Sequence, residues 1–120
     1  MLKLRITNKT RGRALADRAD IADTSEKRRT GLLKHTGLAP GEGLWIVPSE
    51  GVHTFAMKFT IDVLFLSKKR VVLKTRPHMV KRRISLCLTA HSVVELPAGT
   101  IDETGTQKGD QLELEKFSVD

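Results

Sequence analysis

The chain has 120 residues, of which 39% are hydrophobic and 29% charged, with one cysteine and a formal net charge of +7. We expect residues 1–120 to form a single domain with a core of ordinary size. No run approaches the roughly 18 consecutive apolar residues of a membrane-spanning helix, and residues 1–5 lack a signal-peptide core. These features predict a cytoplasmic protein without an internal disulfide.

The amino-terminal residues predict two strands. Leu2, Leu4 and Ile6 alternate with polar residues, as in a strand buried on one face. A turn at residues 8–12 and a weaker strand at residues 14–22 follow.

The one main helix is expected to begin near Asp23. This carboxylate is placed to cap the first turn, and Glu26 three residues later completes an approximate capping box. The helix would present Lys27–Arg29 to solvent and end at Gly37.

The middle of the chain predicts a sheet core. β-Branched and aromatic residues, separated by turn residues, favour strands at residues 44–47, 53–59, 61–66 and 71–75. The strand at residues 61–66 is apolar on both faces except for Asp62, so we expect it to be central and covered on both sides. Arg76-Pro77-His78 is expected to break the strand that precedes it.

The remaining strands are expected at residues 84–88, 91–96 and 111–117, with at most a short helical turn at residues 100–104. About eight short strands and one true helix define the fold class. We predict an α+β, β-rich fold whose mostly antiparallel sheet forms a partly closed barrel with one main helix.

Charged residues inside apolar strands mark the candidate site. Lys58, Asp62 and Glu95 each lie among apolar neighbours, and an unpaired buried carboxylate is costly. A structural interpretation stays open for each: an ion pair or capped turn for Lys58 and Asp62, and backbone N–H donors to the carboxylate for Glu95.

Short segments along the chain resemble those of the domain of unknown function 192 family, small prokaryotic proteins. The matching segments span roughly residues 15–115; they are Ala22–Thr24, Gly31–Leu33, Pro40–Leu44, Met57-Lys58, Ile61–Leu66, Val94–Gly99 and Gly109-Asp110. The resemblance implies a compact β-rich α+β domain with an open groove. It makes Met57-Lys58 and the segment from Glu95 to Gly99 the best candidates for a shared site. It implies no reaction, and many relatives look like exported proteins.

Three functions remain open from the sequence. The leading hypothesis is a small-ligand or peptide-binding module whose groove contains Met57, Lys58, Asp62, Glu95 and Gly99. The second is nonspecific binding of nucleic acid or an acidic partner through basic runs at Lys68, Lys69 and Arg70 and at Lys81, Arg82 and Arg83.

An enzyme of unknown class is the third possibility. It would use Lys58, Asp62 and Glu95, with His53 as a proton carrier. The scattered histidines and the absence of closely spaced cysteine or histidine pairs predict neither a metal site nor a cofactor.

Overall fold

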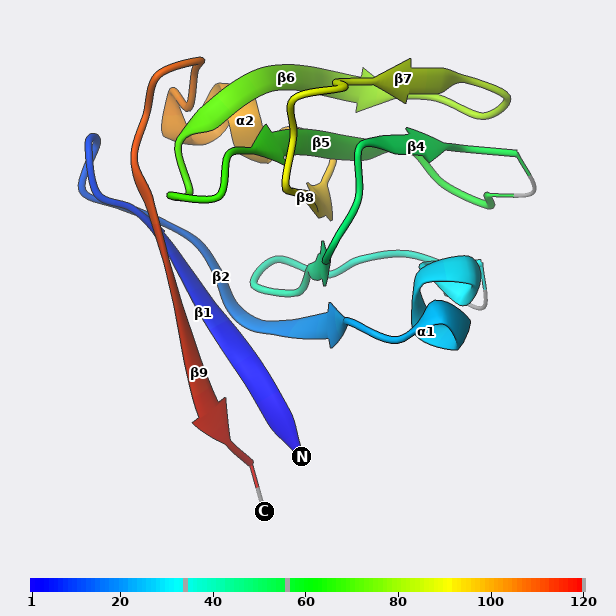
Figure 1. Cartoon of the computed structure of the whole chain (residues 1–120), viewed down its shortest axis with the longest axis horizontal. Helices are drawn as coiled ribbons and strands as arrows, with labels where there is room; N and C mark the ends of the chain where they lie inside the picture. The colour runs from blue at the N-terminus through cyan, green and yellow to red at the C-terminus, as the bar shows by residue number, and fades with distance from the viewer. Residues whose placement is uncertain (34, 56, 120) are drawn as a thin grey trace.

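The computed structural model describes residues 1–33, 35–55 and 57–119. Its strands are β1 (Leu2–Asn8), β2 (Arg13–Ala22), β3 (Leu44–Ile46), β4 (Gly51–His53), β5 (Ile61–Leu66), β6 (Val72–Met79), β7 (Ile84–Leu86), β8 (Ser92–Pro97) and β9 (Leu112–Ser118). Its helices are α1 (Ser25–Thr30) and α2 (Thr100–Thr104). Figure 1 shows β1, β2 and β9 on one side of the molecule and β4 to β7 on the other.

Seven strands form one sheet in the order β6-β5-β8-β3-β2-β1-β9, and β4 and β7 form a second, two-stranded sheet. All pairings among the described strands are antiparallel except that of β2 with β3, which is parallel. The predicted β-rich, mostly antiparallel α+β fold is therefore confirmed. The seven-stranded sheet is not closed, although an isolated bridge joins Val71 to Gln111 near its two ends, so the partly closed barrel is not confirmed.

The central position of β5 is confirmed. All six of its residues are buried, and β6 and β8 flank it. Leu64 and Leu66 face one hydrophobic cluster, which also contains Trp45 and Leu96. Ile61, Val63 and Phe65 face a second cluster, as expected from side chains that alternate across a strand.

The helix boundaries differ from the prediction. Thr24, and not Asp23, caps α1: its hydroxyl accepts a hydrogen bond from the Lys27 amide at 3.2 Å. The helix ends before Gly31, whose φ of 47° lies in the region that favours glycine, and so it never reaches Gly37. The described residues form two short helices and no long one.

The strand predicted at residues 53–59 is also wrong. β4 ends at His53, and a turn follows in which the Met57 amide donates to the Thr54 carbonyl at 3.2 Å. Thr54 ends the strand because its hydroxyl and backbone bind residues 80–83 across the two-stranded sheet: Arg83 N–H donates to the hydroxyl at 2.8 Å.

The predicted break at Pro77 is absent, and β6 continues to Met79. The pairing moves from Arg76 opposite Val63 to Met79 opposite Ile61, so two residues of β6 face Asp62 alone. This is a β-bulge, which accommodates both Pro77 and the positive φ of His78, 50°. In the part of the chain that the structure describes, no helix is long and apolar enough to cross a membrane.

Candidate binding cleft

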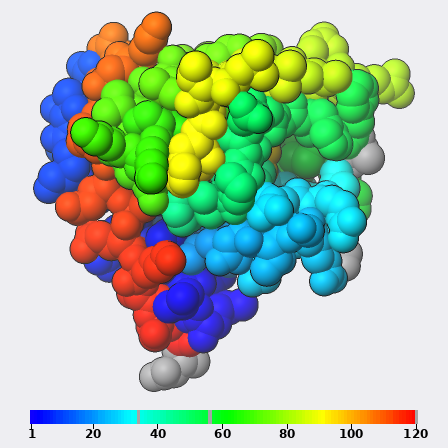
Figure 2. Space-filling view, in the orientation of Figure 1, coloured from blue at the N-terminus to red at the C-terminus, as the bar shows by residue number. Residues whose placement is uncertain are grey.

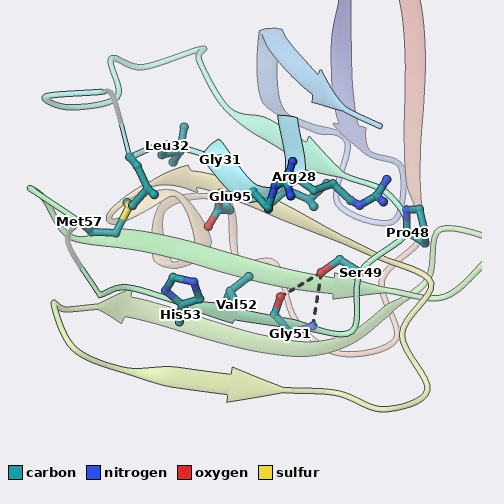
Figure 3. A pocket seen from close by; sticks show the side chains of 13 residues that line it. Arg28, Gly31, Leu32, Pro48, Ser49, Gly51, Val52, His53, Met57 and Glu95 are labelled. Carbon is teal, nitrogen blue, oxygen red and sulfur yellow. Dashed lines mark hydrogen bonds between the residues drawn. The ribbon is translucent and has the colours of Figure 1, made fainter. Parts of the chain in front are cut away.

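A cleft of about 230 Å³ lies between α1, the β3–β4 connection and β4. In Figure 2 the α1 residues (cyan) adjoin the residues around β4 (green) on the same face of the molecule. Its lining residues come from five segments; they are Arg28, Arg29, Gly31, Leu32, Leu33, Ile46, Pro48, Ser49, Gly51, Val52, His53, Met57 and Glu95. Figure 3 shows these side chains around one common space.

Glu95 forms the floor of this cleft. It lies in β8 with Leu44 of β3 on one side and Val63 of β5 on the other, and it is only 5% exposed. No residue that the structure describes donates a hydrogen bond to its carboxyl group or forms an ion pair with it, so the predicted backbone donors near residues 97–99 are not found. Burial raises the pKa of Glu95 to about 7.

The walls of the cleft are mainly apolar. Leu32, Val52 and Met57 are buried, and they belong to the second hydrophobic cluster, which Ile61, Val63 and Phe65 of β5 also face. Leu32 is placed there because the chain turns after Gly31, with the Leu33 amide bonded to the Thr30 carbonyl at 2.9 Å. An apolar wall excludes water and strengthens electrostatic interactions with a group at the floor.

The rim carries positive charge. Arg28 holds α1 against the β3–β4 connection, because its guanidinium donates to the backbone carbonyls of Asp23 at 3.1 Å and Val47 at 3.4 Å. Arg29 is exposed beside it. The sequence prediction presented this basic run to solvent and did not expect a cleft beside it, whereas Arg28 and Arg29 line one in the structure.

The predicted site residues fall in three places. Met57 and Glu95 line the same cleft. Lys58 is exposed and does not line it, and there is no ion pair between Lys58 and Asp62. Asp62 and Gly99 lie near α2, outside the cleft lining.

Asp62 has a structural set of partners. Its carboxylate accepts hydrogen bonds from the His78 amide at 2.9 Å and from the Ile101 amide at 2.8 Å. These bonds fill the β6 bulge and fix the start of α2, which Gly99 caps with a φ of 96°. The capped-turn interpretation of Asp62 therefore describes the structure better than the ion pair. Because Asp62 pairs with Leu96 and Glu95 with Val63 on opposite faces of the sheet, the two carboxylates form no acid–base pair.

His53 also lines the cleft, and its ring lies 5.7 Å from the ring of Phe55.

Lys68 and Lys69 are exposed in the turn before β6, where the half-buried Arg70 places its guanidinium 4.8 Å from the Trp45 ring. Lys81–Arg83 are exposed in the loop after β6. The two basic runs therefore lie at opposite ends of an eight-residue strand.

Comparisons with known proteins define the family. The model of the domain of unknown function 192 family, DUF192 (Uncharacterized ACR), matches residues 6–114. The chain belongs to this family, as its motifs indicated.

Two archaeal relatives carry the name UPF0127. The UPF0127 protein of Thermococcus sibiricus is 33% identical over 118 residues, which cover 92% of this chain and 74% of the relative. UPF0127 protein TK1120 of Thermococcus kodakarensis is 30% identical over 114 residues, covering 89% and 71%.

Two solved structures share the fold. A protein of unknown function from Novosphingobium aromaticivorans has a TM-score of 0.79 and 23% identity, covering 92% of this chain and 83% of the other. A Sinorhizobium meliloti protein provisionally named as a transcription regulator has a TM-score of 0.82 and 22% identity, covering 95% and 94%.

Proposed function

We propose that this chain is a small-ligand or peptide-binding module and that the ligand occupies the cleft between α1, the β3–β4 connection and β4. The observation that carries the proposal is Glu95: the residue is 5% exposed and lies at the floor of the cleft, and no described residue donates a hydrogen bond to its carboxyl group. Buried polar groups are nearly always paired, and an unpaired one in a cleft is a candidate ligand contact. A ligand with a hydrogen-bond donor at this position supplies the missing partner.

The pKa of Glu95 indicates which kind of hydrogen-bond donor the ligand carries. With a pKa of about 7, the carboxyl group changes between its neutral and ionised forms around neutral pH. An ammonium group, such as a free amine or a peptide amino terminus, interacts best with the ionised form. We therefore propose a ligand that carries an amine at the end that reaches the floor.

The rest of the cleft restricts the ligand further. A volume of about 230 Å³ lies below the roughly 300 Å³ at which drug-sized sites begin, which favours a small metabolite or one or two residues of a peptide. Leu32, Val52 and Met57 offer an apolar surface along the wall. Arg28 and Arg29 at the rim offer contacts to a carboxylate.

Binding of an amine to ionised Glu95 makes affinity depend on pH. Below the pKa the ligand must displace the proton, so affinity rises as the pH increases through about 7, and it falls again above the pKa of the ligand's own amine. Calorimetric titration of a pooled amine and short-peptide set at about pH 6 and about pH 8, one pH unit on either side of that pKa, should show tighter binding at the higher pH.

Two substitutions test the assignment. Glu95→Gln keeps the shape but cannot ionise, so it should weaken binding by about tenfold or more and remove the pH dependence. Lys58→Ala, next to Met57 but outside the cleft lining, is the matched control and should bind normally. Equal affinities for the native chain and Glu95→Gln at the higher pH would refute the proposal.

Binding of nucleic acid or an acidic partner through the basic runs stays a second proposal. Lys68–Arg70 and Lys81–Arg83 are separated by β6, whose eight residues span about 26 Å, so they offer two separate contacts. Charge reversal in one run at a time should lower the salt dependence of binding to a short oligonucleotide. An unchanged salt slope in both variants would eliminate this alternative.

A further inference from the structure

The two-stranded sheet turns an apolar face outward. In the pairing of β4 with β7, Val52 lies opposite Ser85, and both are buried. Ile84 and Leu86 alternate with Ser85 and so point to the other face. Those two side chains are 58% and 57% exposed, although a sheet with one buried face ordinarily presents polar residues to water.

Neighbouring residues extend this apolar face. Phe55 is 46% exposed and, with Ile84 and Leu86, lines a shallow apolar depression of about 240 Å³. Leu88, in the turn that follows β7, is 75% exposed. Val80, before β7, is 43% exposed. The shared depression makes Phe55, Ile84 and Leu86 one exposed apolar patch, and such a patch marks an interaction surface.

A basic loop adjoins the apolar face. Lys81, Arg82 and Arg83 stand between Val80 and Ile84, and all three are exposed. No carboxylate among the described residues forms an ion pair with them. Segment 80–88, which lies at the surface along the upper edge in Figure 2, thus combines free cationic side chains with exposed apolar ones.

We propose that the apolar face and the basic loop together bind the surface of an anionic phospholipid bilayer. Anionic headgroups attract Lys81–Arg83, while Ile84, Leu86 and Leu88 enter the boundary between headgroups and acyl chains. The acidic strand β9, with Glu113 and Glu115, lies on the opposite side of the molecule from β7 in Figure 1 and so points away from the bilayer.

The size of the face favours a bilayer over a folded protein. β4 and β7 have three residues each, about 10 Å of strand, whereas a stable protein interface buries roughly 800 Å² on each partner. Nucleic acid accounts for the basic loop but not for the apolar residues beside it, because those residues make no favourable contact with phosphates. A bilayer interface presents both chemistries within a few ångströms.

Vesicle co-sedimentation tests the proposal with the full chain. Vesicles of phosphatidylcholine mixed with phosphatidylglycerol in about equal amounts should bind the protein, and vesicles of phosphatidylcholine alone should bind it much less. Lys81→Gln with Arg82→Gln should weaken binding to the anionic vesicles by about 30-fold, since each cation near the surface contributes about 1 kcal/mol. Lys68→Gln with Lys69→Gln changes the net charge equally and should weaken binding by less than about threefold.

A second pair of variants distinguishes the bilayer from other acidic partners. Ile84→Ser with Leu88→Ser removes exposed apolar side chains without altering charge, and it should weaken vesicle binding by about tenfold or more. The same variant should bind heparin, a polyanion without an apolar phase, as the native chain does at each salt concentration. Two results would overturn the proposal in favour of simple charge attraction. One is an equal loss of vesicle binding in the Lys81/Arg82 and the Lys68/Lys69 variants, and the other is full vesicle binding by the Ile84/Leu88 variant. Unchanged urea midpoints for all variants verify that each remains folded.

Discussion

Asp62 and Glu95 lie on adjacent strands of one sheet, both are buried, and both were predicted site residues, yet their surroundings differ. Asp62 points toward α2, where two backbone amides donate to its carboxylate at 2.8 and 2.9 Å. Glu95 points into the cleft, and none of the described residues pairs with it. A buried charge with donors stabilises the fold locally, whereas one without donors destabilises it until a ligand or a proton arrives.

Part of the difference arises from the bulge in β6, which supplies one of the two donors. Because the pairing shifts there, the amide of His78 is turned toward Asp62 in place of a strand partner. β8 is regular at Glu95, and its backbone groups pair with β3 and β5. Asp62 therefore has one donor at an irregularity of the neighbouring strand and a second, the Ile101 amide, in α2, whereas no described backbone amide reaches Glu95.

The largest expected effect is on stability after loss of the Asp62 charge. Asp62→Asn keeps the size but puts an amide N–H₂ near the backbone donors, so at least one buried N–H loses its acceptor. We expect the free energy of unfolding to fall by about 3 kcal/mol, measured by urea denaturation at neutral pH. A loss below about 1 kcal/mol would show that the hydrogen bonds to Asp62 do not stabilise the fold to the expected extent.

Glu95→Gln is the matched isosteric change on the other face of the sheet. It should raise the free energy of unfolding, whereas Asp62→Asn lowers it. The folded protein holds the Glu95 proton up to a pKa of about 7, against the ordinary value of 4.5. Folding therefore binds a proton in this window, and the native chain loses stability as the pH rises from about 4.5 to about 7. The loss reaches at most about 3 kcal/mol and is constant above that range.

The variant has no such titration. Its stability should match that of the native chain at about pH 4 and exceed it at about pH 8, by up to about 3 kcal/mol. Urea denaturation of both proteins across this pH range measures the difference. Parallel stability curves would mean that Glu95 is already paired in the folded protein.

The sequence predicted the parts of the fold that follow from side-chain periodicity. The central strand at residues 61–66 was correct because apolar residues on both faces leave no solvent-facing side. The strand at residues 53–59 and the break at Pro77 were wrong, because contacts of Thr54 with residues 80–83 and the bulge opposite Asp62 depend on partners far away in the chain. Periodicity contains no information on such partners.

The site was predictable to a similar extent. Glu95 and Met57 were identified by a charge within an apolar strand and by family motifs, and both line the cleft. Arg28 and Arg29 were not, because a helix continuing to Gly37 would have kept them at the solvent face. The positive φ of Gly31 is the missing information, and a glycine seven residues after the N-cap Thr24 was the available signal.

The smallest expected effect concerns the wall of the cleft. Thr24→Ala removes the cap of α1 and should lower the free energy of unfolding by about 1 kcal/mol. Asp23→Ala, at the cap position expected from the sequence, should cost at most about 0.5 kcal/mol through the helix dipole.

Amide hydrogen exchange locates the effect. In Thr24→Ala the Arg28 and Gly31 amides, which bond to the Thr24 and Lys27 carbonyls, should exchange faster. The Ile101 amide, bound to Asp62, should not respond beyond the change in global stability. Faster exchange at both places by the same factor would mean that α1 opens only with the whole molecule. Faster exchange in α1 alone means that α1 opens by local unfolding while the Asp62 side of the sheet stays closed.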